Sequence, residues 1–152
     1  MITLASESDT LALGAALAAP ARRGHVIALS GPLGAGKTTL ARGFIAARGD
    51  TEEVVSPTFT LVQVYEALEM PIWHFDLYRL EKPEDAYELG LEEALAGAIT
   101  LIEWPERLGS FLPASRLDVT LSATGTGRAA ELVYRGVGES PWSTLNWKGA
   151  RL

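Results

Sequence analysis

Cysteine is missing from this sequence of 152 residues. Its absence excludes a disulfide framework, a thiol nucleophile and a cysteine metal site, and it is consistent with a reducing compartment. Basic residues are also few: 13 Lys and Arg stand against 19 Asp and Glu, which gives a formal net charge of −6. Proteins that bind nucleic acid unaided usually carry a basic face, so tight direct binding to RNA or DNA is disfavoured.

Long apolar runs are missing as well. No stretch approaches the roughly 18 consecutive apolar residues that indicate a membrane span, so we expect no membrane contact. The short apolar run at residues 11–20 follows an acidic segment without Lys or Arg. A secretory signal carries positive charge at that point, and we therefore expect a cytoplasmic protein.

The patterns that are present alternate between strand and helix. Apolar spacing together with capping and breaking residues predicts helices over residues 10–22, 37–47 and 83–96. Short apolar or alternating runs predict strands over residues 25–30, 59–65, 71–77, 99–104, 117–121 and 129–134. This order predicts a three-layer α/β domain with a mostly parallel sheet and antiparallel edge strands, the last two paired as a hairpin across 124–127.

The chain has about the length of one domain, and we expect that domain to cover residues 1–136. Its first helix is expected to be capped by Ser8 or Asp9 and to be followed by a break at Gly24. Residues 137–152 mix Gly, Ser and Trp without a period, which is typical of a loosely held C-terminal tail.

The most specific motif lies at residues 31–38, which read G-P-L-G-A-G-K-T and fit G-x-x-x-x-G-K-[ST] in full. The motif follows a predicted buried strand and opens a predicted helix, as in the P-loop NTPase fold. Its glycines let backbone N–H groups approach phosphates, its lysine places a positive charge near the β- and γ-phosphates, and its threonine hydroxyl is a hard ligand for magnesium. No guanine-reading [NT]-K-x-D segment is present, which favours adenine. We therefore predict that ATP and Mg²⁺ are bound by Gly34, Ala35, Gly36, Lys37, Thr38 and Thr39.

Two acids each end an apolar run that is predicted as a strand, Asp76 after residues 72–75 and Glu103 after residues 99–102. Ligands of α/β proteins bind at the carboxyl ends of the strands, and a P-loop enzyme needs an acid there for magnesium or its waters. Both acids are candidates for the metal ligand, and the spacing does not choose between them.

Five further positions have two readings each. Ser56 and Thr58 flank a proline about twenty residues after the P-loop, where a loop either senses the γ-phosphate or forms a plain Ser-Pro turn. Trp104 could stack on a purine and Arg128 could reach a phosphate, although the residues alone favour a packed tryptophan and a solvated arginine. His74 is expected to be a packed or hydrogen-bonded histidine rather than a catalyst.

Four segments in this order resemble the TsaE (YjeE) family, bacterial ATPases needed for threonylcarbamoyladenosine synthesis at position 37 of tRNAs. They read G-P-L-G-A-G-K-T-T at 31–39, S-P-T-F-T-L-V at 56–62, H-F-D-L-Y-R-L at 74–80 and E-W-P-E-R-L at 103–108. The P-loop is shared by a large superfamily, whereas the last two segments are far more particular. The resemblance covers about residues 5–135.

The resemblance implies that Thr38 and Glu103 bind magnesium and that Asp76 supports hydrolysis by ordering or activating water. With Lys37, these acids are the expected catalytic residues. The segment around Ser56 and Thr58 is implied to be a switch loop.

At the nucleotide itself, the resemblance implies that Trp104 lies near the base, Arg128 near the nucleotide and Thr10 near the adenine side. The implied partners are the TsaD and TsaB proteins, which would hold the tRNA, so that this chain meets tRNA only indirectly. ATP turnover would then reset or activate that pair, and an isolated protein without an arginine finger is expected to be slow.

Two other functions fit a P-loop on a chain of this size. A small-metabolite kinase would need an acceptor pocket and usually an arginine-rich lid, whereas the arginines here are scattered. A non-catalytic binding module would use ATP only to order a loop for a partner.

Overall fold

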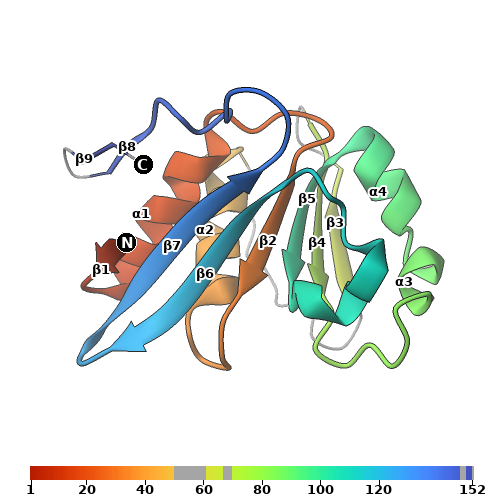
Figure 1. Cartoon of the computed structure of the whole chain (residues 1–152), viewed down its shortest axis with the longest axis horizontal. Coiled ribbons are helices and arrows are strands. Elements are labelled where there is room, and N and C mark those ends of the chain that lie inside the picture. The colour runs from red at the N-terminus through yellow and green to blue at the C-terminus, as the bar shows by residue number, and fades with distance from the viewer. Residues whose placement is uncertain (50–60, 67–69, 148–149, 152) are drawn as a thin grey trace.

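The computed structural model describes residues 1–49, 61–66, 70–147 and 150–151 (Figure 1). In this part of the chain seven strands form one sheet in the order β1-β7-β6-β2-β5-β4-β3. Their bounds are Ile2–Leu4 (β1), Val26–Ser30 (β2), Val62–Tyr65 (β3), Ile72–Asp76 (β4), Ile99–Glu103 (β5), Arg116–Thr124 (β6) and Gly127–Arg135 (β7). The predicted contacts of Ser56 and Thr58 lie outside the described residues.

The centre of the sheet is parallel and both of its edges are antiparallel. β2 pairs in parallel with β5 and β6, and β5 pairs in parallel with β4. The antiparallel pairs are β1 with β7, β7 with β6 and β3 with β4. β2 and β5 are almost entirely buried apolar runs because helices cover both of their faces. The predicted α/β fold and its hairpin between Thr124 and Gly127 are confirmed.

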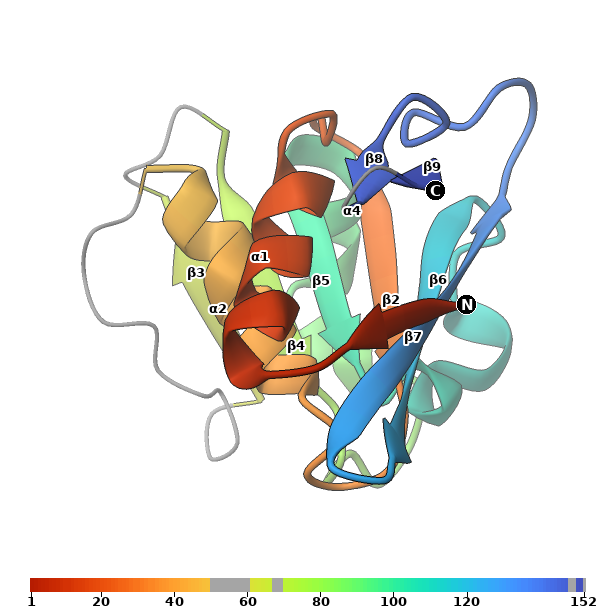
Figure 2. The same ribbon diagram turned by 90° about the vertical axis from the view of Figure 1, so that its left-hand side faces the viewer.

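Helices lie on both faces of the sheet and complete the three layers (Figures 1 and 2). α1 (Glu7–Ala18) and α2 (Lys37–Ala47) cover one face, and α3 (Asp85–Glu88), α4 (Leu91–Gly97) and the 3-10 helix η1 (Pro105–Phe111) cover the other. Each face has its own cluster of buried apolar side chains. None of the helices in the described ranges has the length and apolar character needed to cross a bilayer.

The bounds of α1 differ from the predicted 10–22. Its cap is Ser6, whose Oγ accepts a hydrogen bond from the N–H of Asp9 at 3.3 Å, and not Ser8 or Asp9. The helix ends four residues earlier than expected because Pro20 has no N–H with which to continue the helical hydrogen bonds.

The helix predicted over residues 83–96 is divided into α3 and α4. The break is at Gly90, which has a left-handed φ of 93°. A Cβ at this glycine would lie 2.7 Å from the ring of Trp73, so the chain passes Trp73 at a distance that only glycine permits.

α1 and α2 pack with their backbones in close approach through two glycines. A Cβ at Gly14 of α1 would lie 2.1 Å from the carbonyl oxygen of Leu40, and one at Gly43 of α2 would lie 2.2 Å from that of Leu11. Because α2 follows the P-loop directly, this contact holds the N-terminal half of α1 beside the predicted phosphate site.

The C-terminal segment carries one deeply buried side chain. Trp142 is 3% exposed and belongs to the core that α1 and α2 cover. Its Nε1–H donates to the carbonyl oxygen of Leu17 at 2.9 Å. Beyond it, the strands Asn146–Trp147 (β8) and Ala150–Arg151 (β9) pair with each other. The burial of Trp142 was not expected from the sequence, because residues 137–152 show no periodicity that marks a buried position.

Candidate functional site

The turn between β2 and α2 is shaped by glycines. Gly31, Gly34 and Gly36 have φ values of 139°, 78° and 105°, a backbone region that residues with a Cβ rarely adopt. α2 starts at Lys37, and the helix has no side-chain cap at its N-terminus. The turn therefore presents backbone N–H groups and the positive end of a helix dipole, which together suit a phosphate.

Lys37 lies folded over this turn and is 5% exposed. Its Nζ donates to the carbonyl oxygen of Gly31 and, at 3.0 Å, to that of Pro32. The same Nζ lies 4.0 Å from the centroid of the Trp104 ring, a cation–π contact. These contacts hold the ammonium group of Lys37 against the turn.

The charge of Lys37 lies among carboxylates. Burial lowers the pKa of the ammonium group below its ordinary value, and the charges of Glu103, Glu106 and Asp76 act in the opposite direction. The negative charge of a bound phosphate would also raise the pKa of Lys37, as these carboxylates do. The positive charge of Lys37 therefore favours the binding of an anion.

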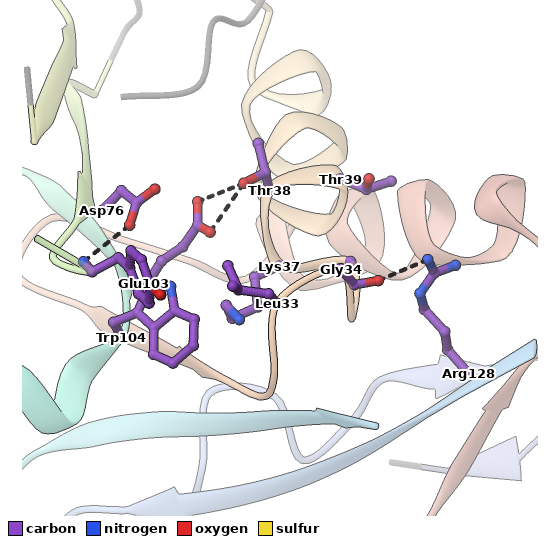
Figure 3. A pocket seen from close by; sticks show the side chains of 11 residues that line it. Leu33, Gly34, Lys37, Thr38, Thr39, Asp76, Glu103, Trp104 and Arg128 are labelled. Atoms are coloured by element: carbon purple, nitrogen blue, oxygen red, sulfur yellow. Dashed lines mark hydrogen bonds between the residues drawn. The ribbon is translucent and has the colours of Figure 1, made fainter. Parts of the chain in front are cut away.

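The two predicted acids lie side by side at the carboxyl end of the parallel strands. Asp76 of β4 and Glu103 of β5 are direct partners in the register of the two strands. Thr38, the second residue of α2, has its Oγ1 3.0 Å from both Oε1 and Oε2 of Glu103 (Figure 3). Asp76 is 7% exposed, and its Oδ1 accepts from the N–H of Tyr78 at 3.2 Å. Residues far apart in the sequence thus place hard oxygen atoms at the P-loop.

His74 contacts this group from within the sheet. Its side chain is fully buried, and its Nε2 lies 2.6 Å from Oε2 of Glu103. The prediction of a packed or hydrogen-bonded histidine is confirmed. Its partner could not be predicted, because the contact depends on the pairing of β4 with β5.

Arg128 and Thr10 border the other side of the loop. The Nη2 of Arg128, on β7, donates to the carbonyl oxygen of Gly34 at 2.9 Å (Figure 3). A Cβ built on Gly36 would lie 3.3 Å from Cδ of Arg128 and 3.5 Å from Cγ2 of Thr10. Thr10, in the first turns of α1, is 1% exposed. Both residues therefore lie against the P-loop, and the contacts implied by the family resemblance, Arg128 with the nucleotide and Thr10 with the adenine side, stay predictions.

Trp104 has a left-handed backbone, with φ of 60°, where β5 gives way to η1. Its ring packs against Lys37 and lies 4.8 Å from the ring of Tyr78, centroid to centroid. The tryptophan is thus part of the site wall, and contact with a nucleotide base stays a prediction.

These side chains surround one cavity of about 360 Å³, within the range of ligand pockets. The lining residues are Leu33, Gly34, Gly36, Lys37, Thr38, Thr39, Asp76, Tyr78, Glu103, Trp104 and Arg128. Ala35 is buried behind the loop and Thr10 lies beside it. Sequence reasoning missed Leu33 and Tyr78, although both fall within the quoted motifs, at a variable P-loop position and beside Asp76.

The donor set suits magnesium together with a phosphorylated ligand. Mg²⁺ in phosphoryl-transfer sites is commonly held by one or two carboxylates, a hydroxyl and substrate phosphates. Thr38 and Glu103 supply such oxygens next to the phosphate-binding turn. Within the described residues there is no group of three or more His, Asp or Glu side chains that could hold a metal.

Comparison of the sequence with known proteins gives concordant matches. The family described as "Threonylcarbamoyl adenosine biosynthesis protein TsaE" matches residues 4–130. The tRNA threonylcarbamoyladenosine biosynthesis protein TsaE of Rickettsia bellii is 44% identical over 119 residues, which cover 78% of this chain and 83% of that protein. The protein of the same name from Bacillus subtilis is 37% identical over 131 residues, which cover 86% and 81%.

A solved structure extends the similarity to the fold. The crystal structure of Bacillus subtilis YdiB superimposes with a TM-score of 0.74 at 32% sequence identity. The superposition covers 86% of this chain and 82% of that one.

Proposed function

The chain belongs to the TsaE family of threonylcarbamoyl adenosine biosynthesis proteins, and from this we propose that it binds ATP with Mg²⁺ and hydrolyses the ATP. Hydrolysis serves the formation of N6-threonylcarbamoyladenosine at position 37 of tRNA, together with the TsaD and TsaB proteins. The observation that carries the proposal is the joint position of Lys37, Thr38, Asp76 and Glu103 around one cavity.

Binding of ATP uses the loop and its lysine. The N–H groups of residues 34–38 and the ammonium group of Lys37 hold the β- and γ-phosphates. Thr38 Oγ1 and a carboxylate oxygen of Glu103 hold the metal. When bound, magnesium neutralises charge that develops on the phosphate oxygens.

Asp76 orients the attacking water. Its carboxylate lies at the end of β4, directly beside Glu103 in the strand register, and is fixed through Oδ1 by the N–H of Tyr78. An acceptor held in this way directs one hydrogen of the water, so that its oxygen faces the γ-phosphate in line with the leaving group.

The isolated protein turns over slowly and TsaD–TsaB completes the site. Among the described residues that line the cavity, Arg128 is the one arginine, and its guanidinium group already donates to the carbonyl oxygen of Gly34. A stabilising arginine or its equivalent contributes about 10³ to 10⁵ in rate in other P-loop enzymes. The net charge of −6 supports tRNA binding by the partners rather than by this chain.

The test compares ATP hydrolysis by the wild type and Asp76→Asn, each alone and with TsaD–TsaB. Asparagine keeps the acceptor for the N–H of Tyr78 but loses the negative charge. We expect unchanged ATP binding and turnover lowered by about 10² to 10⁴, the contribution typical of such groups. Glu84→Gln, an exposed change away from the cavity, is the matched control.

Normal turnover in Asp76→Asn with the partners present contradicts the role of Asp76. Wild-type protein that binds ATP but shows no increase in hydrolysis with TsaD–TsaB contradicts the partner assignment. Transfer of phosphate to a small acceptor would then identify a metabolite kinase. ATP-dependent association without any turnover would identify a binding module.

A further inference from the structure

We propose that His74 is a positioning residue that fixes the carboxylate of Glu103 through Oε2 and leaves Oε1 to the metal. This inference rests on the proposed binding of Mg²⁺·ATP and deepens it, because it assigns a role to a buried side chain next to the proposed metal ligand. It also predicts which of the two carboxylate oxygens binds the metal.

The register of the sheet brings the two side chains together. His74 on β4 lies opposite Leu101 of β5, and the next alternate pair toward the carboxyl end is Asp76 with Glu103. Alternate residues of a strand point to the same face, so His74 and Asp76 share one face of β4. Glu103 lies two residues beyond the position opposite His74. The imidazole is long enough to reach it, and Nε2 lies 2.6 Å from Oε2 of Glu103.

The contact defines which ring nitrogen carries the proton. A carboxylate oxygen accepts hydrogen bonds, so the short contact places a proton on Nε2 of His74. Nδ1 is buried and has no hydrogen-bond partner among the residues described here. In the Nε2–H form this nitrogen is only an acceptor, so no buried N–H is left unsatisfied.

The hydrogen bond limits how the carboxylate of Glu103 can turn. Both of its oxygens lie 3.0 Å from Thr38 Oγ1, so Thr38 alone does not distinguish them. The bond from His74 to Oε2 does, and it directs Oε1 to the metal. Mg²⁺ requires nearly ideal octahedral geometry, and partners that orient metal ligands commonly contribute 10- to 100-fold in metal affinity or activity.

The experiment compares two variants of His74 that both carry a side-chain amide but differ in side-chain length. The amide nitrogen of His74→Gln can occupy the place of Nε2, whereas that of His74→Asn reaches only as far as Nδ1. The affinity for ATP is measured by calorimetry in excess Mg²⁺ and in EDTA, and the ratio of the two dissociation constants is the magnesium enhancement. Thr100→Val, a fully buried change on β5 outside the cavity, controls for disturbance of the sheet.

We expect His74→Asn to lower the magnesium enhancement by about 10-fold. His74→Gln and Thr100→Val should stay within about 3-fold of the wild type, and binding in EDTA should not change in any variant. An undiminished enhancement in His74→Asn overturns the proposal, and so does an equal loss in both His74 variants. A wild-type protein without magnesium enhancement overturns the metal assignment of the proposed function instead, so the two failures are distinguishable.

A measurement on protein with an unaltered His74 applies even if the His74 variants do not fold. The chain has two histidines, and the ¹⁵N spectrum of the imidazole rings reports which nitrogen is protonated. His25→Asn, outside the cavity, assigns the two signals. We expect the His74 proton on Nε2, and a proton on Nδ1 with a bare Nε2 overturns the proposal.

Discussion

At the scale of single residues, the P-loop contains one glycine, Gly34, at which a side chain is excluded by conformation rather than by space. Gly34 has φ of 78°, yet a Cβ there would meet no atom of the protein within 4 Å. Gly34 lines the cavity, and the open space next to it is where a phosphate is expected. A side chain at this position therefore disturbs the ligand more than the fold.

Gly34→Ala should raise the dissociation constant of ATP by at least about 10-fold, equal to about 1.4 kcal/mol, because its methyl group blocks the approach to the phosphates. Gly24→Ala is a matched control, since Gly24 has φ of 91°, equally open surroundings and a place outside the cavity. Both variants should lose about 1–2 kcal/mol of stability from left-handed strain. Calorimetric titration and denaturant unfolding measure the two effects, and equal ATP affinities of the two variants would count against the phosphate site.

Prediction from sequence succeeds at this scale where the chemistry is local. Gly36, Lys37 and Thr38 are consecutive, so their joint function follows from the motif and its position between a strand and a helix. The bond between His74 and Glu103 joins residues 29 positions apart. It depends on the register between β4 and β5, which no local pattern of these residues specifies.

At the scale of elements, the contact between α1 and α2 positions the site. Gly14 and Gly43 allow the backbones to touch, and α1 brings Thr10 against the loop that leads into α2. A larger residue at either glycine must push the helices apart, because the atoms it meets belong to backbone.

Gly43→Ala should destabilise the protein by about 1–3 kcal/mol or more, as expected for overpacking. The control is Gly97→Ala, at the end of α4, where a Cβ would meet nothing within 4 Å. Because alanine favours a helix over glycine by up to about 1 kcal/mol, this control should be neutral or stabilising. Urea unfolding gives both values, and a neutral Gly43→Ala would contradict the close helix packing.

Element boundaries were predicted less well than element types, for identifiable reasons. The division between α3 and α4 depends on the passage of Gly90 over the ring of Trp73, a tertiary contact that overrides the helical pattern of residues 83–96. The early end of α1 follows from Pro20, a local signal that the apolar spacing through residue 22 obscured.

At the scale of the whole molecule, the C-terminal segment is joined to the core beneath α1. Trp142 packs beside His25 and Tyr134, with ring centroids 5.3 and 6.2 Å away, and donates to Leu17. One buried indole thus ties the segment after β7 to the end of α1 opposite the P-loop.

Trp142→Ala should therefore lower the free energy of unfolding by about 3–5 kcal/mol, the range for large buried aromatic residues. Trp142→Phe, which keeps most of the packing but loses the hydrogen bond, should lose less. Val137→Ala in the same segment is fully exposed and should change stability by no more than about 0.5 kcal/mol. Equal stability of Trp142→Ala and wild type would show that the segment contributes nothing to the fold.

The site as a whole is assembled by topology. The cavity takes residues from the loop after β2, the ends of β4 and β5 and the start of β7. Alternation of strands and helices predicted a parallel centre, and with it the meeting of Asp76 and Glu103 at one edge. The contact of Arg128 with Gly34 spans 94 residues. The residues alone favoured a solvated arginine, and only the family resemblance favoured a position of Arg128 near the nucleotide.

The most direct test of the central claim, that this cavity is an ATP site, is calorimetric titration of Mg²⁺·ATP into the wild type and Lys37→Ala. The wild type should bind one ATP per chain, and the variant should bind at least about 10-fold more weakly, because the phosphates lose a charged partner. An unchanged melting temperature of the variant would show that the loss is local. No binding by the wild type, or equal binding by Lys37→Ala, would contradict the assignment of this cavity to ATP.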